Sequence, residues 1–396
     1  MKDDSMPSET ITSLRETLTN QSPGQAIEQL IATQSRGRDA HGLLMARLLK
    51  HRYEMGLPLT RLTSFDDVPD HLKEEFERRY IAELEKLGQE LLDKHEISQA
   101  WQYFRVINKP GPVADAIAKV PADGAHDDQS EEIIQIAVYE LVNPAHGLKM
   151  MLRSSGMCNT VTAFDQIYLQ MSLPVRMKAA AFLVEAMHEE LTHAVRRHVE
   201  EKVAMLPPDM TLRDLIVHSP WIFEKGSYHT DLSHLSSVIR FARCLTSEAP
   251  QLTLIDDLLF YGEHLNRDLL PHSDPPFGDF FVAHRHFFDV VSGKDVEGGI
   301  GYFRQQMEQA DDDQDRSLAA LVVIDLLARL KQYEQAGPLV LEYLTDERVH
   351  GSAFNDFCRD AKQFGLLKQH AESTNNPLLY LTAELEERRA AGVNDV

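Results

Sequence analysis

Apolar residues recur at intervals of three and four positions along most of the chain, which is typical of helices that bury one face. After Pro69, the apolar residues Leu72, Phe76 and Tyr80 follow this spacing and predict an amphipathic helix capped by Asp70. The same period predicts helices at 97–108, 131–142, 174–206, 230–246, 254–269, 279–291, 296–309, 316–330, 333–344 and 377–389. No convincing set of alternating strands accompanies them, so the sequence predicts an all-α fold.

Three of these predicted helices begin with the same arrangement of residues, which includes a small residue where a neighbouring helix would approach closely. The three sets are Ile97, Ala100, Tyr103 and Phe104; Val296, Gly299, Tyr302 and Phe303; and Tyr333, Ala336, Leu339 and Val340. Segment 327–344 (LARLKQYEQAGPLVLEYL) resembles the second half of a tetratricopeptide repeat (TPR), and the other two sets are similar to it. The chain lacks the aromatic and Leu-Gly signature of the first repeat helix. The resemblance implies stacked antiparallel helical hairpins in an α-solenoid-like fold. The whole chain also resembles uncharacterised helical proteins of bacteria, which imply no activity.

Two polar segments interrupt the helical pattern. The segment 121–130 (PADGAHDDQS) is unperiodic and predicts a linker, and 310–315 (ADDDQD) places carboxylates ahead of a helix, where they suit its N-terminus. The predicted organisation is an unstructured N-terminus at 1–10, an N-terminal helical region at 11–120, a central His- and aromatic-rich region at 131–309, and a TPR-like C-terminal region at 310–396.

The charge balance narrows the classes of partner. The 396 residues carry 62 acidic and 40 basic side chains, and the net charge of −22 repels nucleic acid and anionic membrane surfaces. No apolar run is long enough to cross a membrane, and the first ten residues lack the features of a signal peptide. The sequence therefore predicts a cytoplasmic protein that binds neither nucleic acid nor membrane.

No motif of a known chemistry is present. Phosphate-binding loops, dinucleotide-binding glycines, nucleophile elbows and zinc-finger spacings are all missing. The glycines at 298, 299 and 301 follow no strand, so they favour close helix packing over phosphate binding. The cysteines Cys158, Cys244 and Cys358 are far apart, which favours buried structural thiols over a disulfide framework or a thiolate metal site.

Histidines are concentrated in one segment, since ten of the eighteen lie between His188 and His286. The sequence HEELTH (188–193) is superficially like a zinc-protease motif, but a separation of five puts its two imidazoles about 140° apart on a helix. The apolar face instead predicts His198 as a core or interface imidazole with a hydrogen-bond partner, while His193 lies on the solvated face.

The run 227–234 (SYHTDLSH) joins a loop to a predicted helix with Thr230 as its N-cap. Its two imidazoles, His229 and His234, lie beside the carboxylate of Asp231 and the phenol of Tyr228, a set suited to a metal or an anion. The alternatives are that Asp231 complements the helix dipole and that His234 packs in the core.

His284 lies between phenylalanines at 280, 281, 287 and 288, on an aromatic stripe of a predicted helix. This position predicts a buried ring whose pKa is lowered, so that the neutral imidazole can accept a proton or a metal ion. A structural hydrogen bond explains the same position equally well.

Two functions fit these patterns. The first is a helical-repeat scaffold that binds a peptide or protein partner, and its acidic surface favours a basic or neutral one. The second is a metal-dependent enzyme or small-ligand-binding protein with a His-lined pocket in the central region. The sequence identifies no catalytic residue for it. Its divalent metal, zinc or iron, would be held by His229, Asp231, His234 and His284, and the further pocket candidates are Tyr228, His272 and Asp274.

Overall fold

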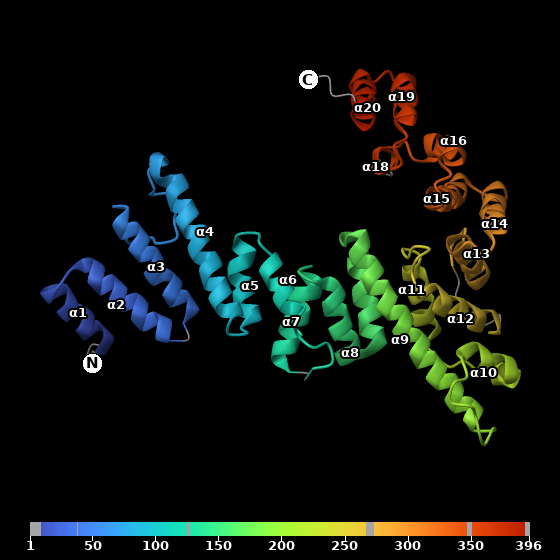
Figure 1. Ribbon diagram of the computed structural model, residues 1–396, viewed down its shortest axis with the longest axis horizontal. Coiled ribbons are helices and arrows are strands. Elements are labelled where there is room, and N and C mark those ends of the chain that lie inside the picture. Colours follow the sequence, from blue (N-terminus) through green and yellow to red (C-terminus); the bar gives the residue numbers. More distant parts are fainter. Residues whose placement is uncertain (1–8, 38, 125–126, 267–272, 347–350, 393–396) are drawn as a thin grey trace. The chain divides into compact units, whose positions relative to one another are not determined.

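A computed structural model describes residues 9–37, 39–124, 127–266, 273–346 and 351–392 (Figure 1). These residues form helices joined by turns and loops, and no strand occurs among them. The predicted all-α fold is therefore confirmed. Within the described part of the chain, no helix combines the length and the apolar character that crossing a bilayer requires.

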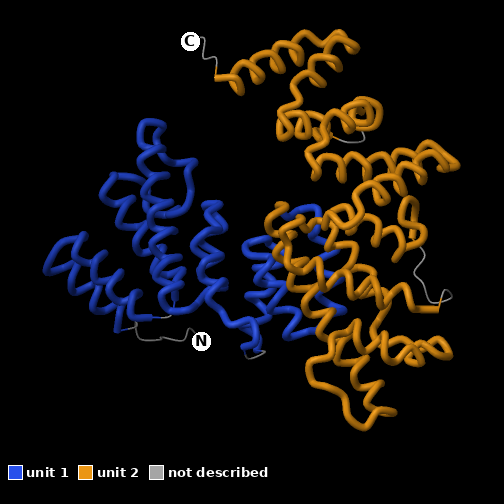
Figure 2. The backbone as a smooth tube through the Cα atoms, turned by 45° about the vertical axis from the view of Figure 1, so that its right-hand side comes forward, with its two compact units in different colours: residues 1–171 blue, residues 172–396 orange. Residues whose placement is uncertain are grey.

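The chain divides into two compact units, Met1–Met171 (unit 1) and Ser172–Val396 (unit 2) (Figure 2). The predicted linker at 121–130 lies inside unit 1, because the helices on either side of it pack against each other and against the helix that precedes them. The predicted limit between 309 and 310 likewise lies inside unit 2, where the helices that flank it are in extensive contact.

Unit 1 is a series of helices in which most neighbours in sequence also pack together. Its elements are α1 (Glu9–Asn20), α2 (Pro23–Arg36), α3 (Ala40–Glu54), α4 (Asp70–Leu92), α5 (Ile97–Val106), α6 (Gly111–Ile117), α7 (Asp128–Tyr139), α8 (Pro144–Ile167) and the 3-10 helix η1 (Tyr168–Gln170). Because α1 begins at Glu9, the last two residues of the predicted unstructured N-terminus are helical; residues 1–8 lie outside the described part.

Unit 2 begins with a long helix that contacts several of those that follow, and continues as a series of sequential neighbours. Its elements are α9 (Leu173–Glu200), α10 (Leu212–His218), the 3-10 helix η2 (Pro220–Gly226), α11 (Leu232–Ala242), α12 (Leu252–Glu263), α13 (Phe280–Ser292), α14 (Val296–Glu308), α15 (Asp313–Arg329), α16 (Tyr333–Tyr343), α18 (Ala353–Asp360), α19 (Phe364–Ser373) and α20 (Pro377–Ala390).

The sequence predicted the first residues of several helices correctly, but it was less successful for the residues that cap them. The three similar sets begin α5, α14 and α16 at the predicted residues, and α20 begins at the predicted Pro377. Two caps were wrong: Pro69 precedes α4, so that Asp70 is the first helical residue, and Asp231 caps α11 in place of Thr230. The acidic run before α15 does serve its N-terminus, where Asp312 accepts a hydrogen bond from the Asp315 amide.

One type of tight turn joins several consecutive helices. His95, Lys331, Lys362 and Asn375 all have positive φ, and the next helix begins two residues after each of them. In every case the amide that follows donates to a carbonyl five residues earlier, at 2.7–2.9 Å. This left-handed C-terminal cap closes one helix and starts the next with almost no loop, which explains why the similar sets recur directly after short turns.

Glycine permits close packing at the α13–α14 hairpin, as the sequence indicates. A Cβ atom on Gly299 would lie 2.3 Å from a methyl of Val290 and 2.6 Å from the carbonyl oxygen of His286, distances that no real side chain tolerates. The turn before α14 depends on Gly293, which has φ of 75°. Gly301, by contrast, is exposed within α14 and has no atom near its Cβ position.

Replacing glycine with alanine should therefore have opposite effects on the stability of unit 2 at Gly293 and at Gly301. Gly293→Ala should lower the free energy of unfolding of unit 2 by about 1 kcal/mol, because alanine is strained at positive φ. Gly301→Ala should raise it by about 0.5–1 kcal/mol, because alanine favours the helix. Urea unfolding measures both effects. Trp221 fluorescence reports unit 2 when Trp101, the other tryptophan, is replaced by phenylalanine. Equal effects of the same sign would contradict this account of the turn.

Candidate functional site

The His-rich segment contributes to a group of rings in unit 2, which we call the aromatic–imidazole cluster. It contains His198, Trp221, Phe223, His229, Tyr261 and His264. The rings of His198 and His229 are in direct contact, with 2.8 Å between Nδ1 of His198 and Nε2 of His229. The edge of the Trp221 ring lies against His198, at 5.3 Å between centroids. The prediction that His198 has a hydrogen-bond partner is confirmed, and His193 is exposed as predicted.

A chain of hydrogen bonds connects this pair of imidazoles to a buried phenol. The His229 backbone amide donates to the Tyr261 hydroxyl oxygen at 2.8 Å, and this oxygen lies 3.1 Å from His229 Nδ1. The phenol can therefore donate its own proton to Nδ1, which leaves the His229 Nε2 proton for His198. Burial, with a smaller contribution from His198, lowers the pKa of His229 to about 4. Burial raises the pKa of Tyr261. Both groups are neutral at pH 7, so the hydrogen bond between Tyr261 and His229 forms between two uncharged side chains.

The remaining residues of the 227–234 run have local roles. Asp231 accepts hydrogen bonds from the Ser233 amide at 2.8 Å and from the Ser233 hydroxyl at 2.6 Å, and the Ser233 hydroxyl bond contributes most to lowering the pKa of Asp231. Its carboxylate thus caps α11, which is the simpler of the two roles considered from the sequence. His234 is half-buried on α11, and the side chain of Tyr228 is mostly exposed.

His284 is buried, as predicted, with 1 % of its surface exposed. Its Nδ1–H donates to the Phe280 carbonyl at 2.7 Å, and the rings of Phe280 and Phe277 lie 4.1 and 4.5 Å from the imidazole, centroid to centroid. Burial, reinforced by the positive charge of Arg243, lowers the pKa of His284 to about 3. Among the residues that the structure describes, its Nε2 has no hydrogen-bond partner. The predicted burial and lowered pKa are confirmed, together with the structural hydrogen bond.

The four predicted metal ligands do not come together. In the described ranges, no group of three or more His, Cys, Asp or Glu side chains could hold a metal ion. The reason is that His229 is engaged with Tyr261 and His198, Asp231 caps its own helix, and His284 is enclosed by phenylalanines. Asp274 is exposed on the loop before α13, and His272 lies outside the described residues.

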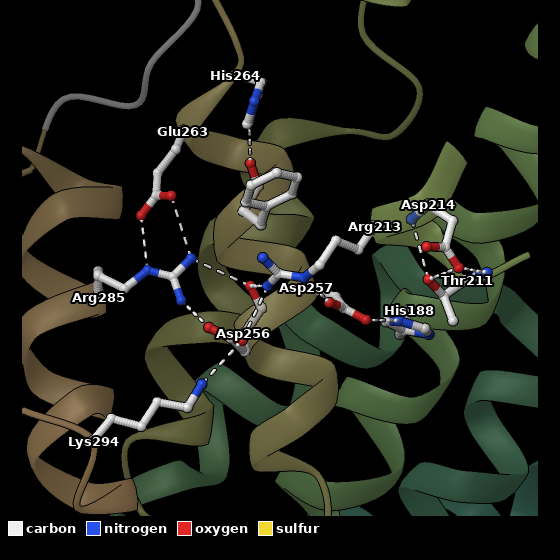
Figure 3. A network of polar contacts seen from close by, with 11 residues as sticks. His188, Thr211, Arg213, Asp214, Asp256, Asp257, Glu263, His264, Arg285 and Lys294 are labelled. Carbon is white, nitrogen blue, oxygen red and sulfur yellow. Dashed lines mark hydrogen bonds and ion pairs between the residues drawn. The ribbon is translucent and has the colours of Figure 1, made fainter. Parts of the chain in front are cut away.

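A network of charged side chains crosses the same region and was not predicted from the sequence (Figure 3). Asp256 and Asp257 of α12 are its centre. Arg213 of α10 contacts both carboxylates at 3.0 Å, and Lys294 contacts Asp256 at 3.0 Å. Arg285 of α13 pairs with Asp256 as well. The network also includes His188 of α9, 3.3 Å from Asp257, and Glu263, 2.9 Å from Arg285.

The balance of charge in this network indicates a structural role. Burial alone would raise the pKa of Asp256, but the hydrogen bond from Lys294 and the charges of Arg285 and Arg213 outweigh it and lower the pKa. Asp256 is thus ionised and is matched by Arg213, Arg285 and Lys294, while Asp257 contacts Arg213 and His188. The network therefore fastens α9, α10, α12 and α13 together. The adjacent Asp256 and Asp257 within an otherwise apolar helix were the signal in the sequence that could have revealed it.

The three thiols differ in exposure. Cys244 and Cys358 are buried, as predicted for structural cysteines, whereas Cys158 is exposed on α8. Burial raises the pKa of Cys358 to about 12. The buried thiol of Cys358 is therefore protonated at neutral pH, which makes it a poor nucleophile.

Unit 1 contains a pocket of about 930 Å³, which we call the unit 1 pocket. It lies outside the His-rich segment. Leu92, Ile97, Val120, Ile133, Ile134 and Met150 form its apolar part. Asp93, Asp115, Asp127, His95 and Lys119 supply its charged or ionisable side chains. The lining comes from the C-terminal end of α4, the start of α5, α6, the loop before α7, and the helices α7 and α8.

Side chains from the neighbouring helices hold the backbone of this pocket in place. His146 Nε2 lies 2.8 Å from the Val120 carbonyl oxygen, and Asn143 donates to the Ala114 carbonyl at 3.0 Å. The first turn of α7 is tied to the α4–α5 turn by a 3.2 Å hydrogen bond from Gln129 to the His95 carbonyl oxygen. One wall of the pocket is formed by described residues of the segment expected to be a linker, namely Pro121, Ala122, Gly124, Asp127, Gln129 and Ser130.

Comparison with known proteins gives no further guidance: no family model, no curated protein and no solved structure matches the chain.

Proposed function

We propose that the protein is a cytoplasmic helical-repeat scaffold that binds a peptide or protein partner. The observation that carries the proposal is the unit 1 pocket, which opens between the consecutive helices α4 to α8 and combines an apolar floor with charged side chains. Binding sites in helical-repeat proteins are formed in this way, by surfaces shared between neighbouring repeats. The recurrent left-handed turns join successive helices with almost no loop, which is compatible with stacked helical hairpins.

The overall charge supports one class of partner. A net charge of −22 disfavours polyphosphate backbones and anionic lipids and favours a partner that is basic or neutral. The alternative of a metal-dependent enzyme has less support, because the four residues that would hold its metal are occupied separately. The aromatic–imidazole cluster and the charged network are both internally satisfied, so we assign them to the stability of unit 2.

Selection from a random peptide library displayed on phage tests the scaffold proposal without assuming a partner. The full-length protein is immobilised, and selections are run in parallel against an unrelated helical protein of similar net charge. Peptides that share a motif, and that bind this protein but not the control, are the expected result. Repeated selections that enrich no peptide over the control would contradict the proposed function.

A further inference from the structure

We propose that the unit 1 pocket binds an extended peptide segment in which lysine or arginine lies next to apolar residues. This inference rests on the proposed scaffold function and names the class of partner and the place where it binds. It follows from three properties of the pocket: its charge, its apolar floor and its size.

The ionisable side chains of the pocket are mainly acidic. Asp93, Asp115 and Asp127 contribute three carboxylates, against the single ammonium group of Lys119 and the imidazole of His95. Asp93 accepts a hydrogen bond from the neutral amide of Gln89 at 2.9 Å. In the described part of the chain, neither Asp93 nor Asp115 forms an ion pair with a lysine or arginine. Their charge is available to a cation from a partner.

The apolar floor provides the other half of the complementarity. Ile97, Ile133, Ile134 and Met150 are each less than a tenth exposed, yet they line the pocket. A partner side chain that covers them removes further apolar surface from water, which is the main favourable contribution to association. An exposed ion pair alone contributes little, so the pocket is suited to a segment that carries both apolar and cationic side chains.

The size of the pocket favours a segment over a single side chain. A volume of about 930 Å³ is near the upper end of the range, on the order of 300–1,000 Å³, of pockets that enclose drug-sized ligands. The acidic residues are all exposed, while the apolar ones are buried or half-buried, so polar contacts form at the mouth and apolar contacts deeper inside. A lysine or arginine suits this arrangement, since its alkyl stem is apolar and its charged end stays near solvent.

Three synthetic peptides test the chemistry. Each is fluorescein-labelled and ten residues long; the first contains leucine and lysine spaced by glycine, the second has glutamate in place of lysine, and the third has serine in place of leucine. Fluorescence anisotropy with the full-length protein should show the Leu/Lys peptide binding at least tenfold more tightly than the other two. Equal binding of the glutamate peptide, or of the serine peptide, would overturn the inference.

Matched variants separate the pocket from the general acidity of the protein. Asp93→Asn with Asp115→Asn should weaken binding of the Leu/Lys peptide roughly tenfold, the effect of losing two exposed ion pairs. The control, Glu96→Gln with Asp123→Asn, changes the net charge equally on nearby exposed residues that do not line the pocket. It should change the affinity less than twofold. Similar losses in both double variants would show nonspecific attraction and overturn the inference.

Two further variants distinguish a specific loss of binding from a loss caused by misfolding. Ala116→Phe adds a ring to a half-exposed lining position and should abolish binding, whereas Lys119→Gln removes a like charge and should tighten it about twofold. A gain of affinity cannot result from misfolding. If phage selection yields peptides whose affinity is the same for the wild type and for all these variants, the pocket assignment fails and the scaffold function stands. If selection yields no peptide at all, the scaffold function fails.

Discussion

Replacing Arg52 with alanine should lower the free energy of unfolding of unit 1 by about 3–5 kcal/mol, because the substitution removes a fully buried side chain that donates to one carboxylate and three backbone carbonyl groups. Arg52 is fully buried and lies 3.0 Å from the carboxylate of Asp67. Its guanidinium also lies 4.9 Å from the centre of the Phe76 ring. Its remaining hydrogen bonds go to the carbonyl oxygens of Pro58, Leu62 and Ser64.

The effect is large because a single side chain organises a long connection. Segment 55–69 joins α3 to α4 without a helix of its own, and Leu57 and Val68 bury themselves against Phe76. Without Arg52, the Asp67 carboxylate and the three backbone carbonyl groups lose their hydrogen-bond donor. Water must then enter to replace it, or segment 55–69 must open to solvent.

The same loop provides the control. Arg61 pairs with Asp66 at 3.1 Å, but both side chains are mostly exposed. Arg61→Ala should change the stability of unit 1 by less than about 0.5 kcal/mol. Urea unfolding followed by Trp101 fluorescence, with Trp221 replaced by phenylalanine, measures both variants. An effect of Arg52→Ala as small as that of Arg61→Ala would show that the guanidinium does not hold the segment.

The second large effect concerns the dependence of unit 2 stability on pH. Folding lowers the pKa of His284 from the ordinary value of 6.5 to about 3. The unfolded chain therefore binds a proton at this imidazole before the folded protein does, and the folded state loses stability as the pH falls below 6.5. The loss continues until about pH 3, where the folded imidazole also becomes charged.

Replacing His284 with phenylalanine should remove this contribution. Relative to wild type, the free energy of unfolding of His284→Phe should rise by about 2–3 kcal/mol between pH 7 and pH 4.5, since each pH unit below 6.5 corresponds to about 1.4 kcal/mol. Comparing the two proteins at each pH cancels the carboxylates that titrate in the same range. The control is Gly301→Ala on α14, which removes no titratable group, so its difference from wild type should stay constant with pH. A constant difference for His284→Phe as well would contradict the burial of a neutral imidazole.

The sequence predicted helices and buried faces because both depend on residues that are close together in the chain. The position of His284 on an aromatic stripe indicated its burial, and the apolar face of α9 indicated a partner for His198. The partner itself, His229, could not be predicted, because it comes from a loop whose path is set by η2 and by the hydroxyl of Tyr261. Caps were missed for a similar reason: Asp231 rather than Thr230 turns its oxygen toward free amides.

The unit 1 pocket could not be predicted from the types of residue in the sequence. Its lining comes from five helices and a loop, and neither its isoleucines nor its aspartates are unusual for a helical protein. The polar segment 121–130 was interpreted as a linker because it lacks periodicity, and its residue types gave no sign that Pro121, Ala122 and Asp127 line a pocket. Only the path of the chain shows that a loop and a floor of buried side chains face each other.

The place where a partner contacts the protein decides most directly between the unit 1 pocket and any other binding surface. Hydrogen–deuterium exchange of the full-length protein, measured by mass spectrometry with and without saturating Leu/Lys peptide, locates that contact. We expect slower exchange at 92–97 and 112–134, which contribute most of the pocket lining, and unchanged exchange in α19 and α20. Protection confined to unit 2, or saturation without any protection of these two segments, would contradict this expectation.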